Sequence, residues 1–337
     1  MSKSEFDIIK RYFQRANNAA DGVIIGIGDD CAILDIPVGQ QLAVTTDSLV
    51  CGVHFFEDVD AYRLGYKSLA VNLSDLAAMG ATAKWVSLAI TLPEIDEPWL
   101  AEFCRGFFTL ADKYNVQLVG GDTTKGPLSI TVSAKGLVPS GKALTRYNAK
   151  NNDIICVSGP LGDGAVGLAL KLEELSLTNR QPFIDALEFT EPRLLLGSQL
   201  INYASSCIDI SDGLSQDLSH ILKQSQCHAD IHLETLPLSD ALKKQIELKN
   251  LSLLQAWQFA VTGGDDYELL FTIPREKLTQ LKENLRVIGL TCFEIGTIKV
   301  LDDVSAIDSK KSLIPSITFT HLQQPIDLNI DGWDHFK

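Results

Sequence analysis

Positive charge is scarce in this chain of 337 residues: 29 Lys and Arg residues stand against 43 Asp and Glu residues, which gives a formal net charge of −14. Binding to nucleic acid or to an anionic membrane surface is therefore not expected. The sequence has no apolar run of the roughly 18 residues that a membrane span needs. Its N-terminus lacks the pattern of a signal peptide. The seven cysteines form no C-x-x-C pair, which disfavours a zinc site or a disulfide framework and favours the cytoplasm.

Several familiar catalytic signatures are also missing. The sequence contains no G-x-S-x-G, no H-E-x-x-H and no H-R-D motif, so the serine-hydrolase, zinc-protease and protein-kinase schemes are not expected. Hydrophobic residues make up 45% of the chain and charged residues 21%, as in ordinary packed globular proteins.

The length predicts two domains. A polar stretch over 144–153 separates two apolar parts, and we place the domains at 1–149 and 150–337. Helical and strand-like patterns alternate in both parts, which predicts a mixed α+β fold. Helices are expected over 61–79, 98–115, 165–174, 193–204, 214–223 and 275–285. Strands are expected over 23–27, 41–46, 85–92, 128–138, 154–158, 258–261, 267–273 and 293–300.

The positions of the acids carry most of the functional information. An apolar run repeatedly ends in Gly, Ser or Thr followed by Asp, as in VIIGIGDDCA, LAVTTDSLV, VQLVGGDTTKG, CIDISDGLS and FAVTGGDDYELLF, while LAVNLSDLAAMGA places an Asp in a helical pattern. Any one such Asp is usually a helix cap or a turn residue. If these acids converge, they repel one another unless divalent cations lie between them. Ligands that are all oxygen favour Mg²⁺.

Two glycine-rich stretches add to this pattern. Residues 120–126 (GGDTTKG) resemble a phosphate cradle without matching the P-loop motif. Residues 159–164 (GPLGDG) precede a predicted helix, where backbone N–H groups suit an anion. Beside clustered acids, such loops suggest a nucleotide polyphosphate bridged by Mg²⁺.

The ordered set GIGDDCA, TTDSLVCGVHF, NLSDLAAMGA, GGDTTKG, DISDGLSQDL and TGGDDYELLF resembles the motifs of bacterial thiamine-monophosphate kinases. Its pieces are shared more loosely with aminoimidazole ribonucleotide synthetase, selenophosphate synthetase and a hydrogenase-maturation protein. The resemblance implies a two-domain α+β fold of the synthetase (PurM-like) type. In that fold the N-terminal sheet and its helices form a homodimer and bind metal and ATP. The C-terminal α/β sandwich completes the ATP and substrate site.

The resemblance also implies an activity, namely ATP-dependent phosphorylation of thiamine monophosphate to thiamine diphosphate with several Mg²⁺ ions and no covalent nucleophile. The implied metal ligands are Asp30, Thr45, Thr46, Asp47, Asp75, Asp122, Asp209 and Asp212. The implied ATP contacts are Gly121, Asp122, Arg146 and Ser211, and the implied substrate contacts are His54, Asp265 and Trp333. Among these, Asp47, Asp122 and Arg146 are expected to matter most for catalysis.

The chain departs from the family pattern at Cys51, where an acid is usual, and at Asp265, where a glutamate is usual. Both positions bear on the substrate contacts. Two alternative functions stay open: another ATP-dependent synthetase of the same superfamily, and a non-catalytic regulator that binds a nucleotide or thiamine. The full set of motif acids favours an enzyme over the regulator, because a sensor needs fewer metal ligands.

Overall fold

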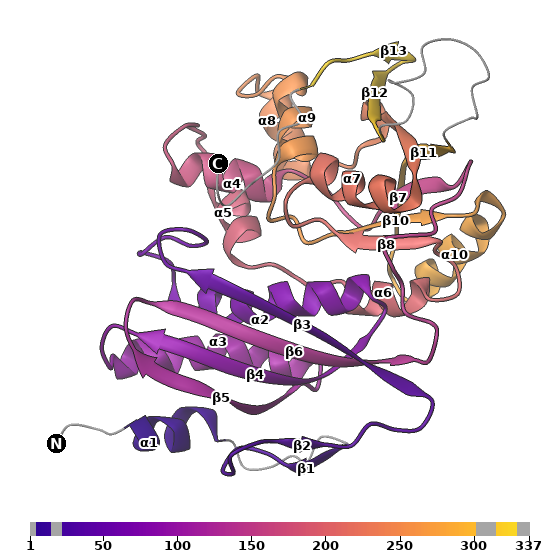
Figure 1. The fold of residues 1–337 in the computed structure, drawn as a ribbon. Helices are drawn as coiled ribbons and strands as arrows, with labels where there is room; N and C mark the ends of the chain where they lie inside the picture. The colour runs from indigo at the N-terminus through magenta and orange to yellow at the C-terminus, as the bar shows by residue number, and fades with distance from the viewer. Residues whose placement is uncertain (1–4, 15–21, 301–314, 329–337) are drawn as a thin grey trace. The chain divides into compact units, whose positions relative to one another are not determined.

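The computed structural model describes residues 5–14, 22–300 and 315–328 (Figure 1). It divides into two compact units. The first comprises Met1–Leu76, Ala81–Ala143 and Glu188–Leu194, and the second comprises Ala77–Gly80, Leu144–Leu187 and Leu195–Lys337. The predicted division into 1–149 and 150–337 does not include two short exceptions. Ala77–Gly80 belongs to the second unit, and Glu188–Leu194 belongs to the first. None of the described helices is long and apolar enough to cross a membrane.

The first unit is built on a four-stranded sheet in the order β3-β6-β4-β5, in which only β4 and β5 run parallel. Its elements are α1 (Glu5–Ile8), η1 (Ile9–Phe13), β1 (Val23–Ile25), β2 (Ile33–Leu34), β3 (Gln40–Val50), α2 (Ala61–Ala78), β4 (Thr82–Leu92), α3 (Glu97–Lys113), β5 (Gln117–Lys125) and β6 (Ser129–Pro139). The helices and strands predicted for residues 41–138 lie at these places, and β5 is an additional strand.

The two faces of this sheet have different surroundings. Side chains alternate along each strand, and one set, which includes Leu49, Leu88 and Val132, is buried on the side of α2 and α3 (Figure 1). We call the opposite side the outer face. The short β1–β2 pair covers part of the outer face, where it packs on Trp85, Val119 and Leu137.

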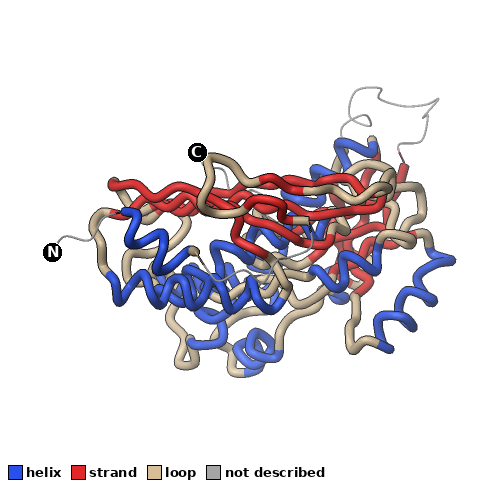
Figure 2. Tube along the Cα trace, turned by 90° about the horizontal axis from the view of Figure 1, so that it is seen from below, coloured by secondary structure: helices blue, strands red, loops and turns tan. Residues whose placement is uncertain are grey.

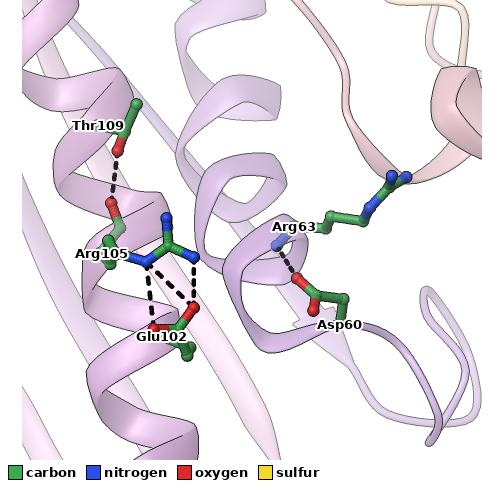
Figure 3. A network of polar contacts seen from close by, with 5 residues as sticks. All are labelled: Asp60, Arg63, Glu102, Arg105 and Thr109. Carbon is green, nitrogen blue, oxygen red and sulfur yellow. Dashed lines mark hydrogen bonds and ion pairs between the residues drawn. The ribbon is translucent and has the colours of Figure 1, made fainter.

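Helices α2 and α3 cross at two glycines that bring their backbones together. A Cβ atom on Gly65 would lie 2.0 Å from the Phe103 carbonyl oxygen, and one on Gly106 would lie 1.8 Å from the Tyr62 carbonyl oxygen. Polar contacts lie at the start of α2 and along α3 (Figure 3). There the Asp60 carboxylate caps α2 by accepting from the Arg63 N–H at 3.0 Å. The Arg105 guanidinium pairs with Glu102 and lies 4.1 Å from the centre of the Tyr62 ring.

A later segment of the chain completes the first unit. Phe189 stacks on Tyr66 with ring centres 4.0 Å apart. The Glu191 carboxylate accepts from the Tyr66 hydroxyl at 2.7 Å and from the Tyr114 hydroxyl at 2.6 Å, and it also pairs with Lys113. We call Glu188–Leu194 the strap, because it is held on α2 and on the C-terminal end of α3 by these aromatic and charged contacts.

The second unit has a seven-stranded sheet in the order β13-β12-β9-β11-β7-β10-β8, antiparallel except for β12 with β9. Its strands are β7 (Ile154–Val157), β8 (Ser206–Asp209), β9 (Cys227–His232), β10 (Leu269–Ile273), β11 (Phe293–Val300), β12 (Ile317–His321) and β13 (Gln324–Pro325). Its helices are α4 (Asp163–Lys171), α5 (Gln181–Glu188), α6 (Leu194–Leu200), α7 (Leu214–Ser225), η2 (Leu233–Thr235), α8 (Asp240–Glu247), α9 (Leu253–Thr262) and α10 (Arg275–Val287).

The core of the second unit lies between this sheet and helices that include α4, α7 and α9, with Phe183 of α5 and Leu242 of α8 also buried in it. Helices are blue and strands red in Figure 2. Representative core residues are Val157, Leu270, Val166, Leu218 and Ala260. The strand predicted over 258–261 is wrong, because these residues form the end of α9. A capping box starts that helix, in which Ser252 and Gln255 satisfy each other's backbone N–H groups.

The close approach of α2 and α3 predicts a large effect of a single methyl group. Gly106→Ala is expected to destabilise the protein by at least about 1–3 kcal/mol, since the added carbon strikes backbone, and this outweighs the gain of about 1 kcal/mol in helix propensity. Thermal unfolding measures the loss. The matched control is Gly120→Ala, where a Cβ atom meets nothing within 4 Å. Equal melting temperatures for the two variants would contradict the packing.

Candidate functional site

A pair of carboxylates lies at the edge of the first unit's sheet. Thr45 and Asp47 project from edge strand β3 toward α2, where the Thr45 hydroxyl donates to Asp75 and the Asp47 N–H donates to the Asn72 side chain at 3.2 Å. Asn72 and Asp75 share one helix face because they are three residues apart. Burial, the charge of Asp75 and a side-chain hydrogen bond with it raise the pKa of Asp47 from 3.8 to about 6. The structure thus brings together Thr45, Asp47 and Asp75.

Asp122 lies at the other edge of the same sheet. Its register partners are Ala89 on β4, Thr131 on β6 and Ser48 on β3, whereas Asp47 is in register with Val132. Three strand spacings of about 4.8 Å put Asp122 about 14 Å from β3. Adjacent residues point to opposite faces, so Asp122 faces outward and Asp47 faces the helices. Within one chain, the register separates these two predicted ligands.

The other predicted residues of the first unit have varied settings. Thr46 lies on the outer face of β3, and its hydroxyl donates to the Thr45 carbonyl oxygen at 2.8 Å. Asp30 is exposed in the loop between β1 and β2. His54 follows β3 in a turn, where its Nδ1 accepts from the Val50 N–H at 3.1 Å. This bond places the proton of the neutral imidazole on Nε2.

In the second unit, three loops meet at one end of the sheet. Strand β10 lies between β7 and β8 and is antiparallel to both, so it starts where they end. The Asp265 N–H donates to the Ser211 carbonyl oxygen at 2.9 Å, and the Tyr267 N–H donates to the Ile210 carbonyl oxygen at 2.7 Å. The predicted residues Ser211 and Asp265 therefore lie side by side, next to Asp209 and Asp212 on the same turn.

The glycine-rich stretch 159–164 is held by acids of the protein itself. Both carboxylate oxygens of Asp266 lie 3.0 Å from the Gly162 nitrogen, and the Leu161 N–H donates to the Pro237 carbonyl oxygen at 3.0 Å. A Cβ atom on Gly159 would lie 2.3 Å from the Glu268 carboxylate, which accepts from the Ser158 hydroxyl. Two of the N–H groups expected to suit an anion are thus already engaged by protein oxygens.

Burial and mutual repulsion shift the acids of this end of the sheet. Burial, followed by the charges of Asp209 and Asp212, raises the pKa of Asp217 from 3.8 to about 8. Burial raises the pKa of Asp163 from 3.8 to about 6, against a hydrogen bond from Ser239. Burial also raises the pKa of Asp266 well above its ordinary value, although the Gly162 N–H favours its ionised form.

Arg146 supplies positive charge beside α7. Its charge offsets a small part of the rise in the pKa of Asp217, and it adds to the lowering of the pKa of His220 that burial causes. The chain before it is fixed to β8, because the Cys207 N–H donates to the Thr145 carbonyl oxygen at 2.9 Å. The predicted nucleotide contact Arg146 is therefore close to the acids of the turn after β8.

The strand-end pattern included Asp266 and Glu268 without assigning them a role, and it missed Asp163 and Asp217, although both lie in the quoted motifs or loops. Trp333 lies outside the described residues. Within the described part of the chain, no three His, Cys, Asp or Glu side chains are grouped so that they alone would hold a metal ion. The metal set of eight residues stays a prediction.

The chain is similar to known proteins along its whole length. Residues 28–138 match the family model "AIR synthase related protein, N-terminal domain" and residues 150–308 match "AIR synthase related protein, C-terminal domain". The thiamine-monophosphate kinase of Escherichia coli K12 is 44% identical over 345 aligned positions, which cover 100% of this chain and 99% of the relative.

Two solved structures agree with this likeness. The thiamine-monophosphate kinase of Stenotrophomonas maltophilia K279a has a TM-score of 0.77 and 41% identity, covering 83% of this chain and 89% of that one. The structure described as AaThiL complexed with AMPPCP and TMP has a TM-score of 0.73 and 28% identity, covering 90% of this chain and 89% of that one.

Fold and sequence together define a two-domain α+β protein of the AIR synthase related class, as predicted. Within that class, the chain belongs to the thiamine-monophosphate kinase family, which is a family of kinases.

The buried Asp163 predicts a pH-dependent stability. Its folded pKa of about 6 exceeds 3.8, so the folded state binds more protons and the unfolding free energy falls as the pH rises between these values. Asp163→Asn is expected to stabilise the protein by up to about 3 kcal/mol at pH 8, with the gain vanishing toward pH 4. Denaturant unfolding at both pH values measures it.

The control for this prediction is Asp240→Asn, which removes the same charge from a carboxylate whose side chain is 104% exposed. It is expected to change stability by less than about 0.5 kcal/mol at either pH. A gain for Asp163→Asn that is the same at pH 4 and pH 8 would show that the charge of its carboxylate is not the cause.

Proposed function

We propose that this protein transfers the γ-phosphoryl group of ATP to thiamine monophosphate, producing thiamine diphosphate and ADP in the cytoplasm. The observation that carries the proposal is the full-length likeness to thiamine-monophosphate kinases. A relative of the same fold has been solved with AMPPCP, an ATP analogue, and TMP. The grouped carboxylates of both units support a reaction between two phosphorylated molecules.

The acceptor needs no general base. The second pKa of a phosphate monoester is about 6, so its oxygen is mostly ionised at neutral pH. We infer direct in-line attack of that oxygen on the γ-phosphorus, without a phosphoenzyme. The barrier then lies in bringing two anions together and in stabilising charge on the transferred group, which positioning and electrostatics supply.

The donor set of the first unit fits a hard divalent cation. Thr45, Asp47 and Asp75 offer only oxygen ligands, and burial together with the charge of Asp75 raises the pKa of Asp47. Together with Asp30, Thr46, Asp122, Asp209 and Asp212, they would hold several Mg²⁺ ions. When bound, Mg²⁺ supplies positive charge that reduces the repulsion between the phosphates of the two substrates.

The remaining residues bind and orient the substrates. In the proposed complex, Arg146 and Ser211 contact the nucleotide, and the backbone at Gly121 approaches it closely. His54, whose Nδ1 accepts from the Val50 N–H, contacts the acceptor. Asp265 contacts the same substrate from the loop before β10.

A homodimer would bring Asp122 to the edge strand that carries the carboxylate pair. The outer face of the first unit's sheet exposes apolar side chains, with Leu42 43%, Val44 59% and Val50 36% exposed, as expected for a protein interface. Strands β3 and β5 are opposite edges of this sheet. If two copies join through their outer faces, β5 of one copy can lie beside β3 of the other. We propose that Asp122 serves the site of its partner.

Loss of one paired carboxylate is expected to remove most of the activity. Asp47→Asn keeps the size of the side chain but removes a charge that would bind the cation, and kcat is expected to fall by roughly 10²–10³-fold. The measurement is ADP release with ATP, thiamine monophosphate and Mg²⁺. The matched control is Asp240→Asn, with near-normal turnover. Near-normal turnover of Asp47→Asn would overturn the metal scheme, and wild-type protein that makes no thiamine diphosphate would overturn the proposed function.

Mixed dimers test the placement of Asp122. Asp47→Asn and Asp122→Asn chains, each inactive alone, are co-expressed with different tags. If Asp122 serves the partner's site, each mixed dimer has one intact site and the random mixture recovers about a quarter of wild-type activity. If Asp122 serves its own chain, both sites of a mixed dimer are defective and no activity returns.

A further inference from the structure

The turn between β8 and α7 is tightly constrained, and it carries two of the proposed metal ligands. It runs from Asp209 to Gly213, and Asp209 is only 4% exposed. Gly213 has a φ of +112°, and a Cβ atom there would lie 2.8 Å from backbone atoms of Thr262. A Cβ atom on Gly264 would lie 2.3 Å from the Ser211 carbonyl oxygen. Substitution at either glycine would therefore disturb the path of the turn.

One buried side chain holds the peptide in the middle of this turn. Asp217 is in the first turn of α7, is 3% exposed, and accepts from the Asp212 N–H through Oδ2 at 3.1 Å. The neighbouring Gln216 donates from Nε2 to an Asp212 carboxylate oxygen, also at 3.1 Å. Asp217 thus fixes the backbone of Asp212 while Gln216 orients its carboxylate.

A purely structural role explains this carboxyl group poorly. Asp217 is only 3% exposed, and it bonds the peptide of a turn that carries two further acids, Asp209 and Asp212. Burying an acid beside other acids costs free energy. The unfavourable setting suggests that the geometry serves the site.

We propose that Asp217 is a positioning residue of the phosphoryl-transfer site, which acts by holding the Asp212 peptide so that the Asp212 carboxylate and the Ser211 side chain stay aligned for Mg²⁺ and nucleotide. This inference rests on the proposed function of the Asp212 turn. Asp217 does not contact the substrates. Its loss therefore weakens binding of the Mg²⁺–nucleotide through Asp212.

The test compares Asp217→Ala, which removes the acceptor, with Asp217→Asn, which keeps an oxygen in the same place. Residues that orient a metal ligand without binding the metal themselves typically contribute about 10–100-fold to metal affinity or activity. Asp217→Ala is accordingly expected to raise the Mg²⁺ concentration for half-maximal rate by about 10-fold or more and to lower kcat. Asp217→Asn is expected to retain most of both. The KM for thiamine monophosphate stays nearly constant in both variants.

The matched control is Asp153→Ala. Asp153 is also 3% exposed in the same unit, and its carboxylate accepts the Lys150 N–H at 3.0 Å in the turn before β7. Its removal is expected to lower the melting temperature about as much as Asp217→Ala, without changing the Mg²⁺ requirement. If Asp217→Ala does not fold, Asp217→Ser replaces it in the test. The serine side chain is shorter than that of aspartate and does not reach the Asp212 N–H.

Calorimetric binding of AMPPCP at several Mg²⁺ concentrations gives a readout that does not depend on turnover. Weaker Mg²⁺-dependent binding by Asp217→Ala, with near-normal binding by Asp217→Asn and Asp153→Ala, supports the positioning role. A change in melting temperature alone, or equal losses in the Ala and Asn variants, overturns it. Wild-type protein that binds Mg²⁺–AMPPCP but does not phosphorylate thiamine monophosphate overturns the proposed function and leaves the positioning role measurable.

Discussion

Asp47 and Asp75 lie in contact at the edge of one sheet, and Asp209, Asp212 and Asp217 gather at the end of another. Ionised carboxylates at such separations repel one another, and burial strengthens the repulsion by removing water. The fold holds these acids in place through neutral hydrogen-bond partners such as Thr45, Asn72 and backbone N–H groups, which do not neutralise the negative charge of the carboxylates. A cation that binds between them relieves the repulsion in the folded state alone and so stabilises that state.

Rigid backbone frames the acids of the second unit. Backbone hydrogen bonds join the residues that follow β8 to the residues that precede β10. Glycines let these loops approach one another at places where a Cβ atom would strike a carbonyl oxygen. The glycine-rich loop after β7 (residues 159–164) is part of the same rigid backbone. Asp266 and Glu268 hold it from within the protein, so Gly159 is needed for close packing against the Glu268 carboxylate, and Gly162 and Gly164 are needed for close packing against the backbone of Ala260 and Asp265. Preorganised side chains of this kind suit a reaction that depends on electrostatics and position.

Local patterns in the sequence predicted much of the fold. The helices of residues 61–79 and 98–115 follow from apolar spacing, and most strands follow from β-branched runs. The strand expected over 258–261 failed because Phe259, Ala260 and Val261 form an apolar run too short to distinguish a strand from a buried helix. The cap at Ser252 and Gln255 was the available signal for a helix. Strand β5 was missed because its Gly120 and Gly121 have low strand propensity.

That acids gather at the ends of strands was predictable from the sequence, but their arrangement was less so. Strand ends rich in Asp identified Asp47, Asp209 and Asp212 from local sequence. Asp217 was overlooked because a carboxylate inside a helix pattern is usually a solvated residue. The distance from Asp47 to Asp122 depends on strand order, and strand order arises from pairings between residues far apart in sequence. Likewise, the contact of Glu268 with Ser158 spans 110 positions, so no local pattern reveals it.

The strap has a practical consequence for dissecting the molecule. A fragment that ends near residue 143 keeps every strand of the first sheet but lacks Phe189 and Glu191. Tyr66 would lose its stacking partner, and two phenol hydroxyls and the Lys113 ammonium would lose their shared carboxylate. Truncation of the protein at the domain boundary would thus yield an N-terminal fragment with an exposed aromatic surface on α2, and this fragment would be prone to aggregation. A peptide spanning the strap, added in trans or fused by a linker, would cover it.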